Sequence, residues 1–120
     1  MNCVFCKIVN GEIPSYILYE DDKIKVFLDI NPRSNGHTLI VPKEHFVDLD
    51  DISLEMVDYI FSKAKDIKKL LETKLNPDGI RLVQNNGVLE DVKHFHLHII
   101  PFYKENNLKD VKEIYEILNN

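Results

Sequence analysis

The sequence lacks the features that mark several classes of protein. It has only two cysteines in 120 residues, and one cysteine pair is too few for the disulfide scaffold of a small secreted domain. It has no apolar run long enough to cross a membrane, and its first residues do not resemble a secretion signal. We therefore expect a soluble cytoplasmic protein with no membrane partner.

The chain also lacks an excess of positive charge. Its 15 Lys and Arg residues stand against 20 Asp and Glu residues, a formal net charge of -5 at pH 7. Binding to a nucleic-acid backbone normally requires a basic patch, so no nucleic-acid partner is expected, although a small anionic ligand can still bind locally. The length predicts one domain over residues 1–120, of a size at which oligomerisation is common.

Strands are predicted wherever apolar residues alternate or cluster between turn residues. They are expected at residues 16–30 (two strands), 37–42, 80–85 and 93–101. The first two are joined as a hairpin at Asp21-Asp22. The loop at residues 31–36 is rich in residues that break regular structure.

Helices are predicted where apolar residues recur at spacings of three and four. A short helical turn is expected over residues 4–10, and a long amphipathic helix begins after Ser53 and stops at residues 76–79. A final helix is expected over residues 108–118 with Asn107 as its cap. Together these elements predict an α+β fold, an antiparallel sheet of about five strands with helices packed on it.

The most unusual stretch is HFHLHII, residues 94–100, which holds three of the five histidines. The histidines alternate with Phe95, Leu97 and Ile99, as in a half-buried strand with one packed face. Residues on one face lie about 6.6 Å apart, so the outer histidines are about 13 Å apart and one zinc ion cannot easily bind all three. A solvated strand normally carries Thr, Lys, Glu or Ser on its outer face, which leaves a proton-handling and nucleophilic site as the favoured interpretation.

The HFHLHII stretch and the segment FLDINPRSNGHTLIVPKEH, residues 27–45, together resemble the histidine-triad (HIT) nucleotide hydrolases and transferases. The resemblance extends from Cys3 to Pro101. It implies the HIT-like fold, with an antiparallel sheet, one long helix and a C-terminal helix. It also implies a homodimer that binds a purine nucleotide or a nucleotide conjugate.

The resemblance assigns roles to two histidines of the stretch. In the family the middle histidine, here His96, attacks the α-phosphorus, and water then hydrolyses the nucleotidyl-imidazole. The substrates implied are nucleoside phosphoramidates or dinucleoside polyphosphates. A neutral imidazole suits this role, because its unperturbed pKa is about 6.5. His98 is expected to donate a hydrogen bond to the phosphate or leaving group, and His37 to support the site without a catalytic step of its own.

Several residues match nucleotide contacts of the family. Asp29 is expected to accept hydrogen bonds from both ribose hydroxyls, although Asp before Asn-Pro is also a common turn residue. Asn85 matches an asparagine that contacts the phosphate, and the alternative is an amide that caps a turn. By resemblance Phe5, Ile8 and Phe27 form an apolar base slot, although they could equally be core, and Ile30 lies close to the base and sugar. The complete predicted set is Phe5, Ile8, Phe27, Asp29, Ile30, Asn85 and Val92.

Cys3 and Cys6 form a C-x-x-C pair. A thioredoxin-like redox role is disfavoured because no βαβ pattern lies nearby, which leaves two reduced thiols or half of a zinc site. His45 is the natural third ligand, and the resemblance implies that His94 is the fourth. The three histidines then divide into one ligand of a structural Zn²⁺ ion, one nucleophile and one hydrogen-bond donor.

The loop before the triad departs from the family pattern. Glu90 and Asp91 stand where the family has Gln and then Ser or Thr, and Phe102 replaces an Arg. Because an ionised carboxylate repels a phosphate, both side chains are expected to point away from it, with backbone N–H groups near Val92 in their place. An enzyme is the leading hypothesis. The alternatives are a nucleotide-binding regulatory or adaptor protein with little turnover, and a small zinc-binding interaction module.

Overall fold

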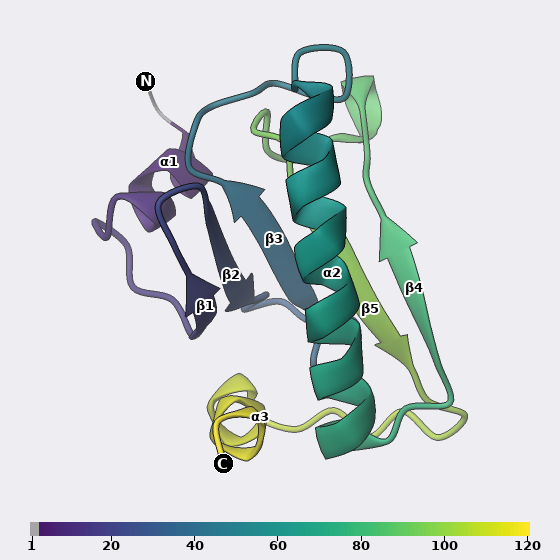
Figure 1. The fold of residues 1–120 in the computed structure, drawn as a ribbon. Coiled ribbons are helices and arrows are strands. Elements are labelled where there is room, and N and C mark those ends of the chain that lie inside the picture. The colour runs from purple at the N-terminus through teal and green to yellow at the C-terminus, as the bar shows by residue number, and fades with distance from the viewer. Residues whose placement is uncertain (1–2) are drawn as a thin grey trace.

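A computed structural model describes residues 3–120 (Figure 1). Its strands are β1 (Ile17–Glu20), β2 (Ile24–Leu28), β3 (Thr38–Pro42), β4 (Gly79–Val83) and β5 (Leu97–Phe102). Its helices are α1 (Val4–Val9), α2 (Leu54–Leu75) and α3 (Val111–Leu118), with a short 3₁₀ helix η1 (Gly87–Leu89). The strands form one antiparallel sheet in the order β1-β2-β3-β5-β4. The predicted α+β fold is therefore confirmed.

The pairing of β3 with β5 brings the two motif segments together. Leu39 lies opposite His98, and Thr38 lies opposite Ile99. The loop before β3 is held tightly against α2, since a Cβ atom at Gly36 would lie 2.6 Å from Cδ1 of Leu75, and the backbone there has φ +91°. Glycine therefore suits this position on both counts.

Both faces of the central strands are covered. Helix α2 crosses one face (Figure 1), and every residue of β2 and of β3 is buried. The cluster on the α2 face includes Ile24, Val26, Leu28, Ile40, Ile60, Ala64, Ile67, Leu71, Phe95, Leu97 and Ile99. The cluster that includes α1 consists of Cys3, Phe5, Ile8, Val9, Phe27, Leu39 and Val41. The second cluster lies where the candidate site is built.

Helix α2 begins and ends as its sequence predicts. The Oγ atom of Ser53 accepts a hydrogen bond from the N–H of Met56. At the other end Asn76 adopts the left-handed conformation, with φ 50°, and its N–H bonds to the carbonyl of Glu72. Side-chain capping at the start and a left-handed residue at the end are common helix boundaries. Within residues 3–120, no helix combines the length and the apolar character needed to span a membrane.

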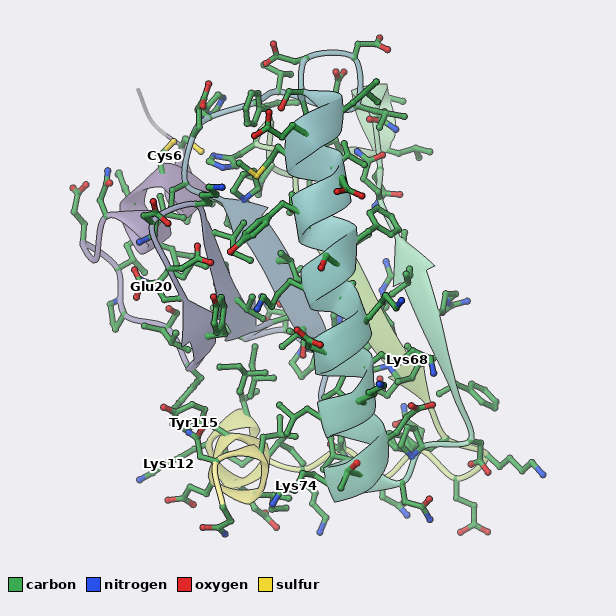
Figure 2. The ribbon with its side chains drawn as sticks, viewed as in Figure 1. Cys6, Glu20, Lys68, Lys74, Lys112 and Tyr115 are labelled. Carbon is green, nitrogen blue, oxygen red and sulfur yellow. The ribbon has the colours of Figure 1, made fainter. Side chains whose placement is uncertain are left out.

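Helix α3 is shorter than predicted. It begins at Val111, and its cap is Asp110 rather than Asn107. The carbonyl of Asn107 accepts a hydrogen bond from Asn35, whose side-chain oxygen accepts the N–H of Lys109. These residues are held by the loop at residues 31–36 and do not continue the helix. The last turn of α2 reaches α3 through Lys74, whose ammonium contacts the carbonyl of Asn120 (Figure 2).

Strand β5 also begins later than predicted, at Leu97 rather than at residue 93. The N–H of Phe95 donates to the carbonyl of Phe46 at 2.6 Å, so this segment pairs with the loop after β3. The alternation of faces persists, with Phe95 in the α2 core. The histidine face is not half exposed as expected, because His94 and His96 are 0% and 4% exposed.

Candidate functional site

The first histidine of the triad faces the cysteine pair. Cys3 caps α1, with its Sγ atom accepting the N–H of Cys6. Nδ1 of His94 lies 3.3 Å from Sγ of Cys3 and 3.4 Å from Sγ of Cys6, and Nδ1 of His45 lies 3.1 Å from Sγ of Cys6. The four ligand atoms lie within 4.8 Å of one another. Figure 2 shows Cys6 on α1, near the end of β3.

The geometry of this Cys/His cluster fits a zinc ion. Sulfur and nitrogen ligands of one tetrahedral zinc are separated by roughly 3.5 Å, close to the observed spacings. Nε2 of His94 lies 2.8 Å from the carbonyl oxygen of Pro42 and donates to it, which leaves Nδ1 unprotonated and able to coordinate. Burial and the neighbouring Cys3 raise the pKa of Cys6 to about 11. A divalent cation would lower that pKa and allow both thiols to bind as thiolates.

The middle histidine, His96, is held by a backbone hydrogen bond in a neutral form. Nδ1 of His96 lies 2.8 Å from the carbonyl oxygen of His94 and donates its proton there. Its Nε2 atom therefore carries the free lone pair. Burial lowers the pKa of His96, and the ring of Phe5 contacts it edge-on with centroids 4.8 Å apart. The imidazole is thus unprotonated near neutral pH, which is the form that attacks an electrophile.

The third histidine is oriented by a chain of hydrogen bonds. The N–H of Arg33 donates to Nδ1 of His37 at 3.1 Å, so the proton of His37 is on Nε2. That Nε2 atom lies 2.9 Å from Nδ1 of His98 and donates to it. The proton of His98 is therefore on Nε2. Burial, followed by electrostatic interaction with His96 and His37, lowers the pKa of His98 to about 4, so His98 is a hydrogen-bond donor in its neutral form.

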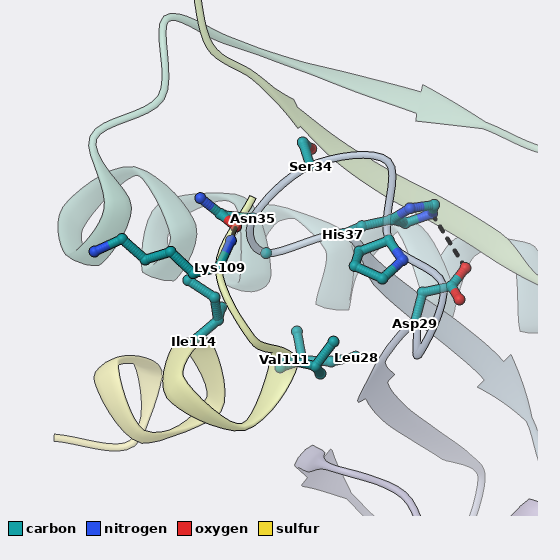
Figure 3. A pocket seen from close by; sticks show the side chains of 10 residues that line it. Leu28, Asp29, Ser34, Asn35, His37, Lys109, Val111 and Ile114 are labelled. Carbon is teal, nitrogen blue, oxygen red and sulfur yellow. Dashed lines mark hydrogen bonds and ion pairs between the residues drawn. The ribbon is translucent and has the colours of Figure 1, made fainter. Parts of the chain in front are cut away.

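Asp29 completes this side of the site. Its Oδ2 atom lies 3.6 Å from Nε2 of His37 (Figure 3), and its Oδ1 atom accepts the N–H of Asn31 at 2.9 Å. The second contact is the turn geometry that the alternative interpretation of Asp29 predicts. The same residue also lines the cavity described below, so the two interpretations are compatible.

Asp29, His37 and His98 bring three ligand atoms within 4.8 Å of one another. A metal bound to Nε2 of His37 would require the ring proton to move to Nδ1. That atom faces the N–H of Arg33, and two donors would then oppose each other. The hydrogen bonds therefore favour a proton-holding cluster over a second metal site.

A cavity of about 450 Å³ opens beside His96 and His98. This volume lies within the range of small-molecule sites, about 300–1,000 Å³. All the predicted nucleotide-binding residues except Asn85 line it: Phe5, Ile8, Phe27, Asp29, Ile30 and Val92. Apolar side chains thus form one part of the cavity, and the carboxylate of Asp29 and the two histidines form another.

Asn85 lies outside this lining. Its carbonyl accepts a hydrogen bond from the side chain of Gln84 at 2.9 Å, and the same amide group bonds to Asn86. The side chain of Gln84 therefore holds this turn through the Asn85 backbone and the Asn86 side chain. The phosphate contact of Asn85 stays a prediction.

The two acidic residues of the loop behave differently. Glu90 is 3% exposed, its carboxylate oxygens have no hydrogen-bond partner among the described residues, and burial raises its pKa. It is turned away from the cavity, as expected. Asp91 lines the cavity together with His96, so the expectation for Asp91 is wrong. The N–H of His94 bonds to the carbonyl of Val92, which makes a tight turn directly after Asp91.

Some cavity residues had no role in the sequence interpretation. Arg33 adds a permanent positive charge to the lining, and Ser15 contributes a buried hydroxyl without a partner among the described residues. The hydrogen bond from His37 to His98 was also missed. Arg33 lies within the motif segment four residues after Asp29, and this proximity is the one sequence signal that points to it.

Comparisons with known proteins point to one family. The HIT domain model matches residues 10–105. An uncharacterized HIT-like protein of Methanocaldococcus jannaschii is 48% identical over 106 residues, covering 85% of this chain and 80% of that protein. The adenosine 5'-monophosphoramidase of Schizosaccharomyces pombe is 41% identical over 103 residues, covering 84% and 74%.

Solved structures give the same result. The crystal structure of a zinc-bound histidine triad family protein from Mycobacterium smegmatis matches with a TM-score of 0.90 and 35% sequence identity, covering 98% of this chain and 91% of that chain. The family model, the relatives and the fold all agree, and the chain belongs to the HIT family.

Proposed function

We propose that the protein hydrolyses nucleoside phosphate conjugates through a nucleotidyl-His96 intermediate. The observation that carries this proposal is the hydrogen bond from Nδ1 of His96 to the carbonyl of His94, which leaves Nε2 as a free nucleophile. The monophosphoramidase activity named for the S. pombe relative supports the same reaction class. Nucleoside phosphoramidates and dinucleoside polyphosphates are the proposed substrates, with a purine as the base.

Substrate binding uses the two parts of the cavity. The base lies against Phe5, Ile8 and Phe27, which remove apolar surface from water. The carboxylate of Asp29 accepts hydrogen bonds from the ribose hydroxyls. Ile30 and Val92 cover the sugar and the phosphate from the rim. This arrangement presents the α-phosphorus to Nε2 of His96.

The first step forms a bond between Nε2 of His96 and the α-phosphorus. The bond from phosphorus to the leaving group breaks, and the leaving group departs with the electron pair and takes any proton it needs from water. The imidazole becomes cationic, and the carbonyl of His94 stabilises it through the proton on Nδ1. His98 donates a hydrogen bond from Nε2 to the charge that develops on oxygen. Water then attacks phosphorus, releases the nucleoside monophosphate and regenerates neutral His96.

We also propose that Cys3, Cys6, His45 and His94 hold a structural zinc ion. The spacing of their ligand atoms and the zinc-bound M. smegmatis structure support this assignment. Bound zinc would supply positive charge that keeps both thiols ionised. It would also tie α1, through Cys3 and Cys6, to the segment that carries His96.

A homodimer is proposed from the open edge of the sheet. Strand β4 lies at the end of the strand order and pairs with β5. Leu82 on β4 and Phe102 on β5 are 43% and 59% exposed. An edge strand with exposed apolar residues is prone to pair with a second copy. Sedimentation equilibrium tests this, with a monomer at high protein concentration as the contrary result.

The test of the enzyme is a substrate panel combined with trapping of the intermediate. Adenosine 5'-phosphoramidate and diadenosine tetraphosphate, each labelled at the α-phosphate, are mixed with the protein and quenched. Wild-type protein should carry label, and His96→Ala should carry none while still binding adenosine monophosphate. His96→Ala with most of the wild-type kcat would exclude this mechanism.

One observation favours the regulatory or adaptor alternative. The Asp91 carboxylate lines the cavity in which an anionic phosphate would bind, and like charges repel. Tight binding of adenosine monophosphate without turnover or labelling of any panel member would support this alternative over the enzyme.

A further inference from the structure

Lys25 is a buried cation in the middle of β2. It is 4% exposed, and lysine is rarely buried without a partner. Its ammonium donates a hydrogen bond to the backbone carbonyl of Ile8 at 2.8 Å, within the protein interior. The residue that faces Lys25 across the hairpin, Glu20, is paired with Lys43 at 2.8 Å. The hydrogen bond from Lys43 and the charge of Lys25 both lower the pKa of Glu20, so Glu20 also interacts electrostatically with Lys25. The carbonyl of Ile8 is the hydrogen-bond partner of the Lys25 ammonium.

The position of Lys25 on β2 explains this contact. Alternate residues of a strand face opposite sides of a sheet, so Lys25 and Phe27 share the face on which α1 packs. Phe27 belongs to the cluster that includes Phe5 and Ile8 of α1, and the three side chains line the cavity. The ammonium of Lys25 thus lies beneath the C-terminal end of the helix that forms one wall of the cavity.

Helix α1 depends on contacts at both of its ends. It has only six residues, and an isolated helix of that length is not stable in water. Cys3 and Cys6 tie its first turn to His45 and His94. Its last turn is held by Lys25, and a cation there is also favoured by the partial negative charge of the helix C-terminus. The segment between these contacts carries Phe5 and Ile8.

We propose that Lys25 is a positioning residue for the nucleobase, which acts through the carbonyl of Ile8 and touches neither substrate nor reacting atoms. By fixing the C-terminal end of α1, it holds Phe5 and Ile8 at the distance from Phe27 that a flat base requires. The identity of the ligand rests on the proposed function. The action of Lys25 on α1 does not, and it can be measured without any ligand.

Lys25→Met tests the proposal, because it keeps the long apolar stem and removes the ammonium. The Kd for adenosine monophosphate and the KM for an adenosine conjugate should rise about five- to tenfold, within the cost of losing one charged hydrogen bond. The kcat should change less than about twofold, because contacts outside α1 fix the protons of His96 and His98. Binding of ribose 5-phosphate, which has no base, should change much less than binding of the nucleotide.

Two further variants separate positioning from a general loss of stability. Lys7→Met removes a positive charge from α1 itself, at a side chain that is only partly buried. The Kd of this variant for adenosine monophosphate should match that of wild type. Lys25→Arg retains a charged donor and should recover most of the affinity. Hydrogen exchange of the free protein should show faster exchange of the α1 amides in Lys25→Met, with the amides of α2 unchanged.

The outcomes distinguish the two proposals. Wild-type protein that binds adenosine monophosphate but shows no turnover argues against the proposed reaction, and the Kd series still tests Lys25. An unchanged Kd in Lys25→Met, an equal rise for ribose 5-phosphate, or the same rise in Lys7→Met would overturn the positioning role. Wild-type protein that binds no nucleotide would overturn both the proposed function and the nucleobase role. Unchanged exchange of the α1 amides would overturn the action of Lys25 on the helix.

Discussion

Nε2 of His37 and Nδ1 of His98 are 2.9 Å apart, and this hydrogen bond determines which nitrogen of His98 faces the cavity with a proton. The direction of this hydrogen bond is itself set by the backbone. The N–H of Arg33 donates to Nδ1 of His37, which leaves the His37 proton on Nε2. A loop N–H thus fixes the donor atom of a histidine on β5 through two imidazole rings. His37 therefore orients the proposed donor without touching the phosphate.

Loss of the His37 proton should slow the reaction more than it weakens binding. His37→Phe leaves Nδ1 of His98 without a donor, so the proton of His98 is free to move to Nδ1 and the phosphate loses a hydrogen bond. We expect kcat to fall about tenfold or more, by analogy with the loss of one oxyanion donor, with KM changed much less. His37→Gln retains an N–H donor close to the Nε2 position and should recover part of kcat. Equal kcat in wild type and His37→Phe would contradict this assignment.

The zinc proposal predicts a shared phenotype for its ligands. Cys6→Ser and His45→Ala each open the tetrahedral site, and metal binding is linked to folding. Both variants should lose zinc from about one ion per chain and unfold at a lower temperature. A chelator should lower the Tm of wild type but not of the variants. Glu44→Ala, beside His45 in the sequence, should retain the metal, and zinc-free wild-type protein would contradict the assignment.

The faces of the motif segment were predicted correctly, although the start of the strand was not. Phe95 lies in the core and His94 and His96 on the other face, because alternation is a local property of an extended chain. The point at which β5 begins depends on the distant carbonyl of Phe46. The start of α3 depends likewise on Asn35, which binds the segment at residues 107–109. Such tertiary contacts leave no periodic signal in the sequence.

The candidate site also has features that the sequence predicts and contacts that it does not. Side-chain identities pointed to Cys3, Cys6 and His45, and the resemblance to the HIT family added His94 and the apolar lining of the cavity. The acceptors that fix the histidine protons are backbone carbonyls, those of Pro42 for His94 and of His94 for His96. Any residue can supply a carbonyl, so these contacts could not be predicted. The Arg33 contact likewise uses a backbone group, its own N–H, and the Lys25 contact uses the backbone carbonyl of Ile8.

Glu90 should make the protein less stable as the pH rises. Burial raises its pKa in the folded state, so the folded protein binds the proton more tightly than the unfolded chain does. Stability is then highest below the ordinary glutamate pKa of about 4.3 and is lost as the pH rises through the higher folded value. Glu90→Gln cannot ionise and should have a higher Tm than wild type near neutral pH.

Measurement of Tm as a function of pH separates the ionisation of Glu90 from a general change in stability. At about pH 4, where Glu90 is protonated, Glu90→Gln and wild type should have similar Tm values. Glu116→Gln, an exposed residue on α3, provides the matched control and should follow wild type at every pH. A Tm difference that is constant with pH would show that Glu90 is not a buried ionisable group.

Removal of the Asp91 charge should accelerate the reaction. The carboxylate lines the cavity with His96, and one charge about 4 Å from a phosphate oxygen in water costs roughly 1 kcal/mol. Asp91→Asn should therefore raise kcat/KM about fivefold. Asp91 is exposed, so the gain should shrink as salt concentration increases. Asp22→Asn, an exposed change in the β1–β2 turn, should have no effect. A gain that is independent of salt would contradict the electrostatic cause, and a loss of activity would show that the Asp91 carboxylate takes part in the reaction.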